Sequence, residues 1–164
     1  MHETAPPKAV SAGLYTPEER ARRDATVWTL VQGLLAPIQF IVFAISLVLV
    51  LRYLYTGEGY EVATKSILLK TALLYTIMVT GAIWEKVVFG QYLLAPAFFW
   101  EDVFSFGVIF LHTLYIYALF NNWDVTTQMM IALAAYATYC VNAFQFIWKL
   151  RAARLQAEAL EAVA

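Results

Sequence analysis

The chain has 164 residues, of which 62% are hydrophobic and 16% aromatic, and its formal net charge is −1. A soluble domain of this size is closer to half apolar, so a protein embedded in a bilayer is the simpler interpretation. The single cysteine excludes an intrachain disulfide framework and a cysteine metal site. We find no cleavable signal peptide, internal repeat, phosphate-binding loop, dinucleotide fingerprint or patch for nucleic acid.

The first 26 residues are the polar part of the chain. Residues 1–15 include two prolines and a glycine and are predicted to form a flexible N-terminal tail. Thr16-Pro17-Glu18-Glu19 then begins a short helix, because threonine can cap it, proline suits the first helical position and Glu19 completes a capping box. Three arginines follow in this helix, which is expected to lie at the membrane surface.

Four apolar segments follow, each long enough to cross a bilayer, at residues 27–53, 64–89, 97–120 and 126–148. We therefore predict an all-α, integral membrane four-helix bundle with an N-terminal interfacial helix. Residues 16–154 form the transmembrane domain in this interpretation, and residues 155–164 form a C-terminal tail. Lys65 and Lys70, near the start of the second span, are interpreted as side chains that extend to the interface.

Four spans place both termini on the same side of the membrane. Most basic residues fall on that side, whereas only Arg52, Lys65 and Lys70 fall on the other. The positive-inside rule therefore predicts a multi-pass protein of the cytoplasmic membrane with both termini in the cytoplasm.

Each span also carries one polar stripe, weighted toward the cytoplasmic half of the membrane. Helical spacing places the members of a stripe on one face, so the four stripes could converge on a cavity that opens to the cytoplasm. For Gln39, Asn142 and Gln145, simple interhelical hydrogen bonds are an equally good explanation, and both interpretations stay open. The stripes contain Gln32, Gln39 and Ser46; Met78, Gly81 and Glu85; Glu101, Ser105, Val108 and His112; and Thr138, Asn142, Gln145 and Lys149.

Three acids and a lysine lie at the boundary of the second and third spans: Glu85, Lys86, Glu101 and Asp102. Ionisable groups are costly there, which makes them functional candidates. The helix dipole favours acids in a first turn, so Glu101 and Asp102 could simply mark a helix start, whereas Glu85 lies near a helix end. Burial favours the neutral form of an acid, and two carboxyl groups in different environments suit acid–base catalysis. These residues are compatible with two functions, acid–base chemistry on an amphiphile and proton-coupled binding or transport, and they do not distinguish between them.

Two further kinds of side chain are candidates for ligand contact. His112 lies about 16 Å beyond Glu101 along its helix, so it cannot touch that acid, and a buried imidazole bonded to a neighbouring helix is the alternative. Trp84 and Trp100 are either interface residues or walls for a flat hydrophobic ligand.

A resemblance that extends over nearly the whole chain after the tail is carried by seven runs: Leu14–Asp24, Trp28–Gly33, Tyr75–Gly81, Ile83–Gly90, Ala95–Ser105, Ala132–Tyr139 and Lys149–Arg154. The chain resembles the 2-vinyl bacteriochlorophyllide hydratase family. That resemblance implies a membrane hydro-lyase of bacteriochlorophyll biosynthesis, in the inner or photosynthetic membrane, which converts the C3 vinyl group of a chlorophyllide or bacteriochlorophyllide to a 1-hydroxyethyl group.

The resemblance also implies a flat tetrapyrrole substrate that brings its own magnesium, so no catalytic metal or redox cofactor is expected. Our hypothesis is that Glu85 or Glu101 protonates the vinyl group, while Asp102 or the other glutamate deprotonates the attacking water. The predicted substrate contacts include His112 as an axial partner of the substrate's magnesium or a bond to its keto group, and Lys86, Lys149 or Arg151 as the partner of its propionate. The full predicted set of substrate-binding residues is His112, Lys86, Gln39, Asn142, Gln145, Trp84 and Trp100.

The expected partners are the tetrapyrrole, membrane lipid, and either neighbouring pigment-biosynthesis enzymes or a second copy of the chain, with no nucleic acid. Two alternatives to the enzyme remain at this point. One is a pigment-binding or assembly protein that does not turn the pigment over, and the other is a small four-helix transporter.

Overall fold

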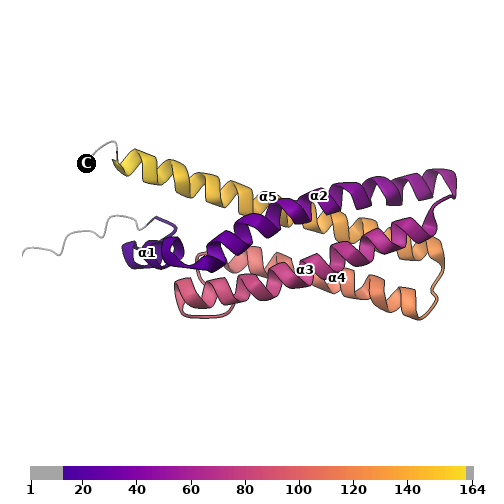
Figure 1. The fold of residues 1–164 in the computed structure, drawn as a ribbon, viewed down its shortest axis with the longest axis horizontal. Helices are drawn as coiled ribbons and strands as arrows, with labels where there is room; N and C mark the ends of the chain where they lie inside the picture. The colour runs from indigo at the N-terminus through magenta and orange to yellow at the C-terminus, as the bar shows by residue number, and fades with distance from the viewer. Residues whose placement is uncertain (1–12, 162–164) are drawn as a thin grey trace, which may run out of the picture.

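The computed structural model describes residues 13–161, which form five helices (Figure 1). They are α1 (Pro17–Ala25), α2 (Val27–Thr56), α3 (Tyr60–Phe89), α4 (Phe99–Phe120) and α5 (Val125–Glu161). The predicted all-helical fold with a short N-terminal helix is confirmed, and α2, α3, α4 and α5 are each long and apolar enough to span a membrane. Residues 1–12 of the predicted tail and residues 162–164 lie outside the described part.

Local sequence explains where the helices begin and end. The predicted capping box of α1 is present: Thr16 Oγ1 accepts from the Glu19 N–H at 3.2 Å, and a Glu19 carboxylate oxygen accepts from the Thr16 N–H at 2.8 Å. α2 and α3 end at Gly57 and Gly90, whose φ angles of 74° and 85° are readily adopted only without a Cβ. α5 continues well past residue 148, so the polar C-terminal region is helical through Glu161.

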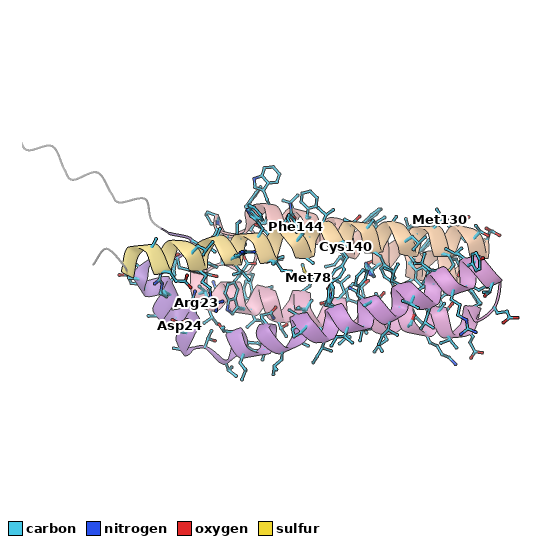
Figure 2. The ribbon with its side chains drawn as sticks, turned by 90° about the horizontal axis from the view of Figure 1, so that it is seen from above. Arg23, Asp24, Met78, Met130, Cys140 and Phe144 are labelled. Carbon is cyan, nitrogen blue, oxygen red and sulfur yellow. The ribbon has the colours of Figure 1, made fainter. Side chains whose placement is uncertain are left out.

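The four long helices run alternately up and down, so that α1, the α3–α4 connection and the C-terminal part of α5 share one end of the molecule (Figure 1). The closest packing is within two hairpins, α2 with α3 and α4 with α5. Weaker contacts of α2 with α5 and of α3 with α4 join the hairpins. Large apolar side chains are exposed on the outside of every long helix, as expected for a multi-pass protein whose surroundings are lipid (Figure 2).

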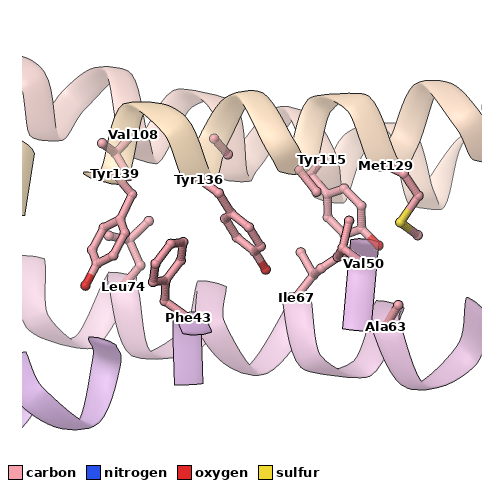
Figure 3. Close-up of a cluster of buried hydrophobic side chains, with 12 residues drawn as sticks. Phe43, Val50, Ala63, Ile67, Leu74, Val108, Tyr115, Met129, Tyr136 and Tyr139 are labelled. Atoms are coloured by element: carbon pink, nitrogen blue, oxygen red, sulfur yellow. The ribbon is translucent and has the colours of Figure 1, made fainter. Parts of the chain in front are cut away.

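Aromatic residues dominate the core between the hairpins (Figure 3). Phe43 of α2 packs edge-on against Tyr136 of α5, with ring centroids 5.3 Å apart, and against Tyr139 at 5.0 Å. Val50, Ile67 and the other members of this cluster are fully or almost fully buried.

The middle of the bundle also contains polar groups. Ser46, Ser66 and Tyr136 join α2, α3 and α5 through two hydrogen bonds of 2.6 Å. Lys70 is fully buried, its ammonium lies 3.8 Å from the centre of the Tyr139 ring, and among the described residues it has no hydrogen-bond partner. The interpretation of Lys70 as an interfacial lysine is therefore wrong.

The reason lies in where α3 begins. The helix starts at Tyr60, so Lys70 lies ten residues, or about 15 Å, from its start, which is half of a typical hydrocarbon thickness of about 30 Å. Lys65 is one turn nearer the end, is exposed, and pairs with Glu61.

Candidate functional site

The candidate site lies at the end of the bundle shared by α1, the α3–α4 connection and the C-terminal half of α5 (Figure 1). Glu85 is near the end of α3, and Glu101 and Asp102 occupy the first turn of α4. All three acids are at least 95% buried, with exposed fractions of 5%, 5% and 3%. None of them is therefore explained as a solvent-exposed residue that merely marks the end of a helix.

Glu85 and Asp102 form a pair of neighbouring carboxyl groups across the α3–α4 contact. Backbone N–H groups of the connecting segment hold both: Leu94 donates to Asp102 Oδ2 at 2.6 Å, and Ala95 donates to Glu85 Oε2 at 3.3 Å. Leu94 adopts a φ of 60° in doing so, a conformation that costs a non-glycine residue about 1–2 kcal/mol. Two carboxylates side by side repel each other, so this geometry favours one shared proton.

Glu101 points instead toward α5, because consecutive helical residues are turned by about 100° from each other. Its carboxylate forms an ion pair with Lys149 at 2.6 Å. The Lys149 ammonium also donates to the backbone carbonyl of Ala97 and lies 5.3 Å from the centre of the Phe98 ring. The cluster thus contains an adjacent carboxyl pair and, beside it, a carboxylate with its own cation.

Polar side chains of α4 and α5 continue the site beyond Glu101. Ser105 donates to the Glu101 backbone carbonyl at 2.9 Å and accepts a bond of 2.8 Å from the Asn142 amide. Next to these residues a cleft of about 480 Å³ opens on the α4–α5 face. Its lining consists of Glu101, Phe144, Gln145, Trp148, Lys149 and Ala152. Phe144 is largely exposed on the outer side of α5 (Figure 2).

An aromatic cluster closes the end of the bundle around these groups. Phe98 is buried, stacks on Phe146 at 5.8 Å and packs edge-on against Trp84 at 5.7 Å. Trp84 donates its indole N–H to Thr29 of α2 at 2.9 Å. These contacts surround the acids with low-polarity material, in which charge interactions are stronger than in water.

α1 packs onto this cluster through both of its ends. Arg22 donates to the Val88 carbonyl at 2.8 Å, and Tyr15, which the sequence assigns to the tail, is buried against Phe89 and Phe98. Burial raises the pKa of the Tyr15 phenol, while the adjacent Arg23 opposes that rise. α1 is therefore a docked part of this end of the fold.

Comparison with known proteins now identifies the family. Residues 15–152 match the family model described as 2-vinyl bacteriochlorophyllide hydratase. The 2-vinyl bacteriochlorophyllide hydratase of Rhodobacter capsulatus is 74% identical over 149 residues, which cover 91% of this chain and 87% of that protein. The protein of the same name from Cereibacter sphaeroides is 74% identical over 155 residues, or 94% and 97% of the two chains.

The chain belongs to the 2-vinyl bacteriochlorophyllide hydratase family. The predicted family is confirmed, and with it the prediction of a hydro-lyase of bacteriochlorophyll biosynthesis. No solved structure gives a significant match to the chain.

The structure brings together five of the predicted site residues: Glu85, Glu101, Asp102, Asn142 and Gln145. Trp84 lies in the adjoining aromatic cluster.

The other four predicted residues lie elsewhere. Lys86 is exposed and donates to the Gly90 carbonyl at the end of α3, and Trp100 is 64% exposed. Gln39 is buried within α2. His112 is fully buried in the middle of α4, where its Nδ1 lies 2.8 Å from the Val108 carbonyl.

The positions of two lysines add to the sequence prediction. Lys149 belongs to the predicted polar stripe of the fourth span, and the structure pairs it with Glu101, a specific contact that the stripe alone does not predict. Lys70 shares a face with Ala63, Ile67 and Leu74, and that apolar spacing was the signal that it points inward.

Proposed function

We propose that this chain adds water across the C3 vinyl group of a bacteriochlorophyllide, and that the reaction takes place at the acid cluster. The relatives named for this activity supply the reaction and the substrate class. The observation that supports the location is the buried Glu85–Asp102 pair beside the ion-paired Glu101, next to a cleft.

The first step in this mechanism is proton donation. The proton shared by Glu85 and Asp102 is transferred to the terminal vinyl carbon, which forms a C–H bond and leaves a cation on the carbon attached to the ring. The macrocycle delocalises that positive charge, and the carboxylate pair left behind stabilises it electrostatically in a site of low polarity.

Water addition completes the reaction. A water molecule forms the C–O bond at the cationic carbon while Glu101 accepts one of its protons. Glu101 suits the role of base because Lys149 pairs with its ionised form. Return of that proton from Glu101 to the Glu85–Asp102 pair restores the starting state, with one water consumed.

His112 takes no part in this mechanism. It lies ten residues, or about 15 Å, along α4 from Asp102. The proposed steps assign both proton transfers to the carboxyl groups and require no contact between His112 and the substrate.

We place this end of the bundle on the cytoplasmic side. The support is the distribution of basic residues, which is concentrated at the end that holds α1 and the C-terminal part of α5. In this orientation the acids lie near the interface, where a planar pigment with a charged propionate can enter from the membrane plane.

Three conservative substitutions test the acid assignment: Glu85→Gln, Glu101→Gln and Asp102→Asn. Membranes that contain each variant are incubated with the 3-vinyl pigment, and the gain of one water in the product is measured by mass. A positioned acid or base contributes about 10²–10⁴ in rate, so each variant should lose activity on that scale. Asp124→Asn is the matched control, because Asp124 caps α5 at the opposite end of the bundle and should retain full turnover.

Full turnover in all three folded variants would refute the acid–base mechanism. A pigment carrier would bind the substrate and return it with unchanged mass, and a transporter would move it across sealed vesicles without altering it. Either result with the unaltered chain contradicts the proposed hydration.

A further inference from the structure

Two buried side-chain oxygens next to Glu101 accept no hydrogen bond from any residue the structure describes. They are Asn142 Oδ1 and Gln145 Oε1, both on α5. Asn142 is only 8% exposed, and Gln145 lines the same cleft as Glu101. A buried acceptor without a donor is costly, and native structures usually supply one from the protein, from water or from a ligand.

The hydrogen bonds around Asn142 fix which way its amide points. Ser105 uses its hydroxyl proton to donate to the Glu101 carbonyl, so its oxygen can only accept from Asn142. The NH₂ group of Asn142 must therefore face Ser105, and its carbonyl oxygen must be the atom without a partner. A flipped amide would leave Ser105 facing another acceptor.

Gln145 and the Glu101 carboxylate line the cleft, and Asn142, buried beside Ser105, adds a second amide oxygen next to it. The Lys149 ammonium, which also lines the cleft, already donates to Glu101 and to the Ala97 carbonyl, so the two amide oxygens are left as acceptors without a donor among the described residues. Asn142 and Gln145 are three residues apart on one helix, so they lie on the same face. A molecule that satisfies them must donate hydrogen bonds. The vinyl arm of the pigment offers only C–H groups, and the carbonyl groups of a tetrapyrrole are acceptors, whereas a water molecule offers two O–H donors.

We propose that Asn142 and Gln145 form a binding site for the attacking water, and afterwards for the hydroxyl group of the product. This inference rests on the proposed hydration reaction and assigns the water to the α5 side of the cleft. One O–H of the water donates to an amide oxygen while the other donates to Glu101, the base that removes its proton. The C–O bond then forms on the face of the vinyl carbon turned toward α5.

This arrangement makes a specific prediction about stereochemistry. A water held on one side attacks one face of the planar cation, so a single epimer of the 1-hydroxyethyl group is formed. When the amide oxygens are removed, water reaches the cation from either side. Both the rate and the epimer ratio then change, whereas affinity for the pigment does not.

The test uses the full-length protein in membranes with Gln145→Met and, separately, Asn142→Leu, which keep similar volume and remove the acceptor. We expect kcat to fall about tenfold to a hundredfold, as for the loss of a hydrogen bond to the reacting group. KM for the pigment should stay within about twofold to threefold, because uniform binding is untouched. The epimer ratio, measured by chiral chromatography, should move toward one.

Gln128→Met is the matched control, a buried glutamine on the same helix that accepts from Tyr60 at the far end of the bundle. It should change neither kcat nor the epimer ratio. Two results overturn the water site: unchanged kcat and epimer ratio in both test variants, or a loss of activity explained by a raised KM with the epimer ratio preserved.

The failure of this inference is separable from failure of the proposed reaction. If the amide variants behave like the unaltered chain while Glu101→Gln is inactive, the water site is wrong and the acid–base mechanism stands. If the three acid variants all retain turnover, the mechanism itself is wrong.

Discussion

Replacement of Lys70 by methionine should stabilise the fold, although it removes a charged residue from the centre of the molecule. Lys70 is fully buried at a depth of about 15 Å along α3, has no acceptor among the described residues, and rests on the Tyr139 ring. Replacing even a buried ion pair by apolar residues of similar volume is often stabilising by about 1–4 kcal/mol, and we take the same range for this lysine, which has no paired charge in the described part of the chain. Loss of the cation–π contact offsets about 1–2 kcal/mol of that gain. The midpoints of these two ranges leave an expected net increase in the free energy of unfolding of about 1 kcal/mol.

Thermal unfolding of the purified protein in detergent micelles, followed by circular dichroism, measures this effect. At about 2–4 °C per kcal/mol for a chain of this size, Tm should rise by about 2–4 °C. The matched control is Lys65→Met, five residues earlier on the same helix, whose exposed and solvent-screened pair with Glu61 should contribute little to stability. A Tm for Lys70→Met below that of the control would refute the reasoning, because it would show that the buried ammonium has a stabilising partner.

Three further predictions concern stability and docking. Gly90→Ala should destabilise the fold by about 1–2 kcal/mol in denaturant titration, because Gly90 has a φ of 85°. Gly33→Ala is the control and should stabilise the fold by up to about 1 kcal/mol, because Gly33 lies in a helix with open space around the new Cβ. Equal effects of the two substitutions would contradict the backbone argument. Ser46→Ala should cost about 1–2 kcal/mol in the same titration, because it removes the hydrogen bonds that Ser46 shares with Ser66 and Tyr136. A neutral result would mean that this network is not formed. Burial raises the pKa of Tyr15, so the phenol binds its proton more tightly when α1 is docked than when α1 is free. Docking of α1 should therefore weaken as pH rises above about 10. Protease cleavage within α1 should increase above that pH in the unaltered chain and not in Tyr15→Phe.

The sequence was most informative where the cause of a structure is local. The capping box at Thr16 and Glu19 follows from four consecutive residues, and it forms as expected. Hydropathy alone predicts four long apolar helices, because a span must be apolar along its whole length. The convergence of Glu85 with Asp102 also follows, since a short connection brings the end of one helix to the start of the next.

Partner choice between distant helices was not predictable in the same way. Lys86 and Lys149 are both lysines near the ends of apolar segments, yet only Lys149 reaches an acid, Glu101, which is 48 residues away in the chain. That distinction depends on how α4 and α5 are rotated about their axes, which is set by packing along their full length. The burial of Lys70 has a related cause: its charge predicts an interface, whereas its apolar neighbours on the same helix face place it in the core.

The division of the bundle into two hairpins affects how a loss of hydratase activity in a variant should be interpreted. Glu85 belongs to the first hairpin and Asp102 to the second, so neither half contains the carboxyl pair by itself. A substitution at the α2–α5 contact, such as at Phe43, can therefore abolish activity without touching the acids, because it weakens the packing of one hairpin against the other. An inactive variant of that kind reports on assembly, and it says nothing about the altered residue's part in the chemistry.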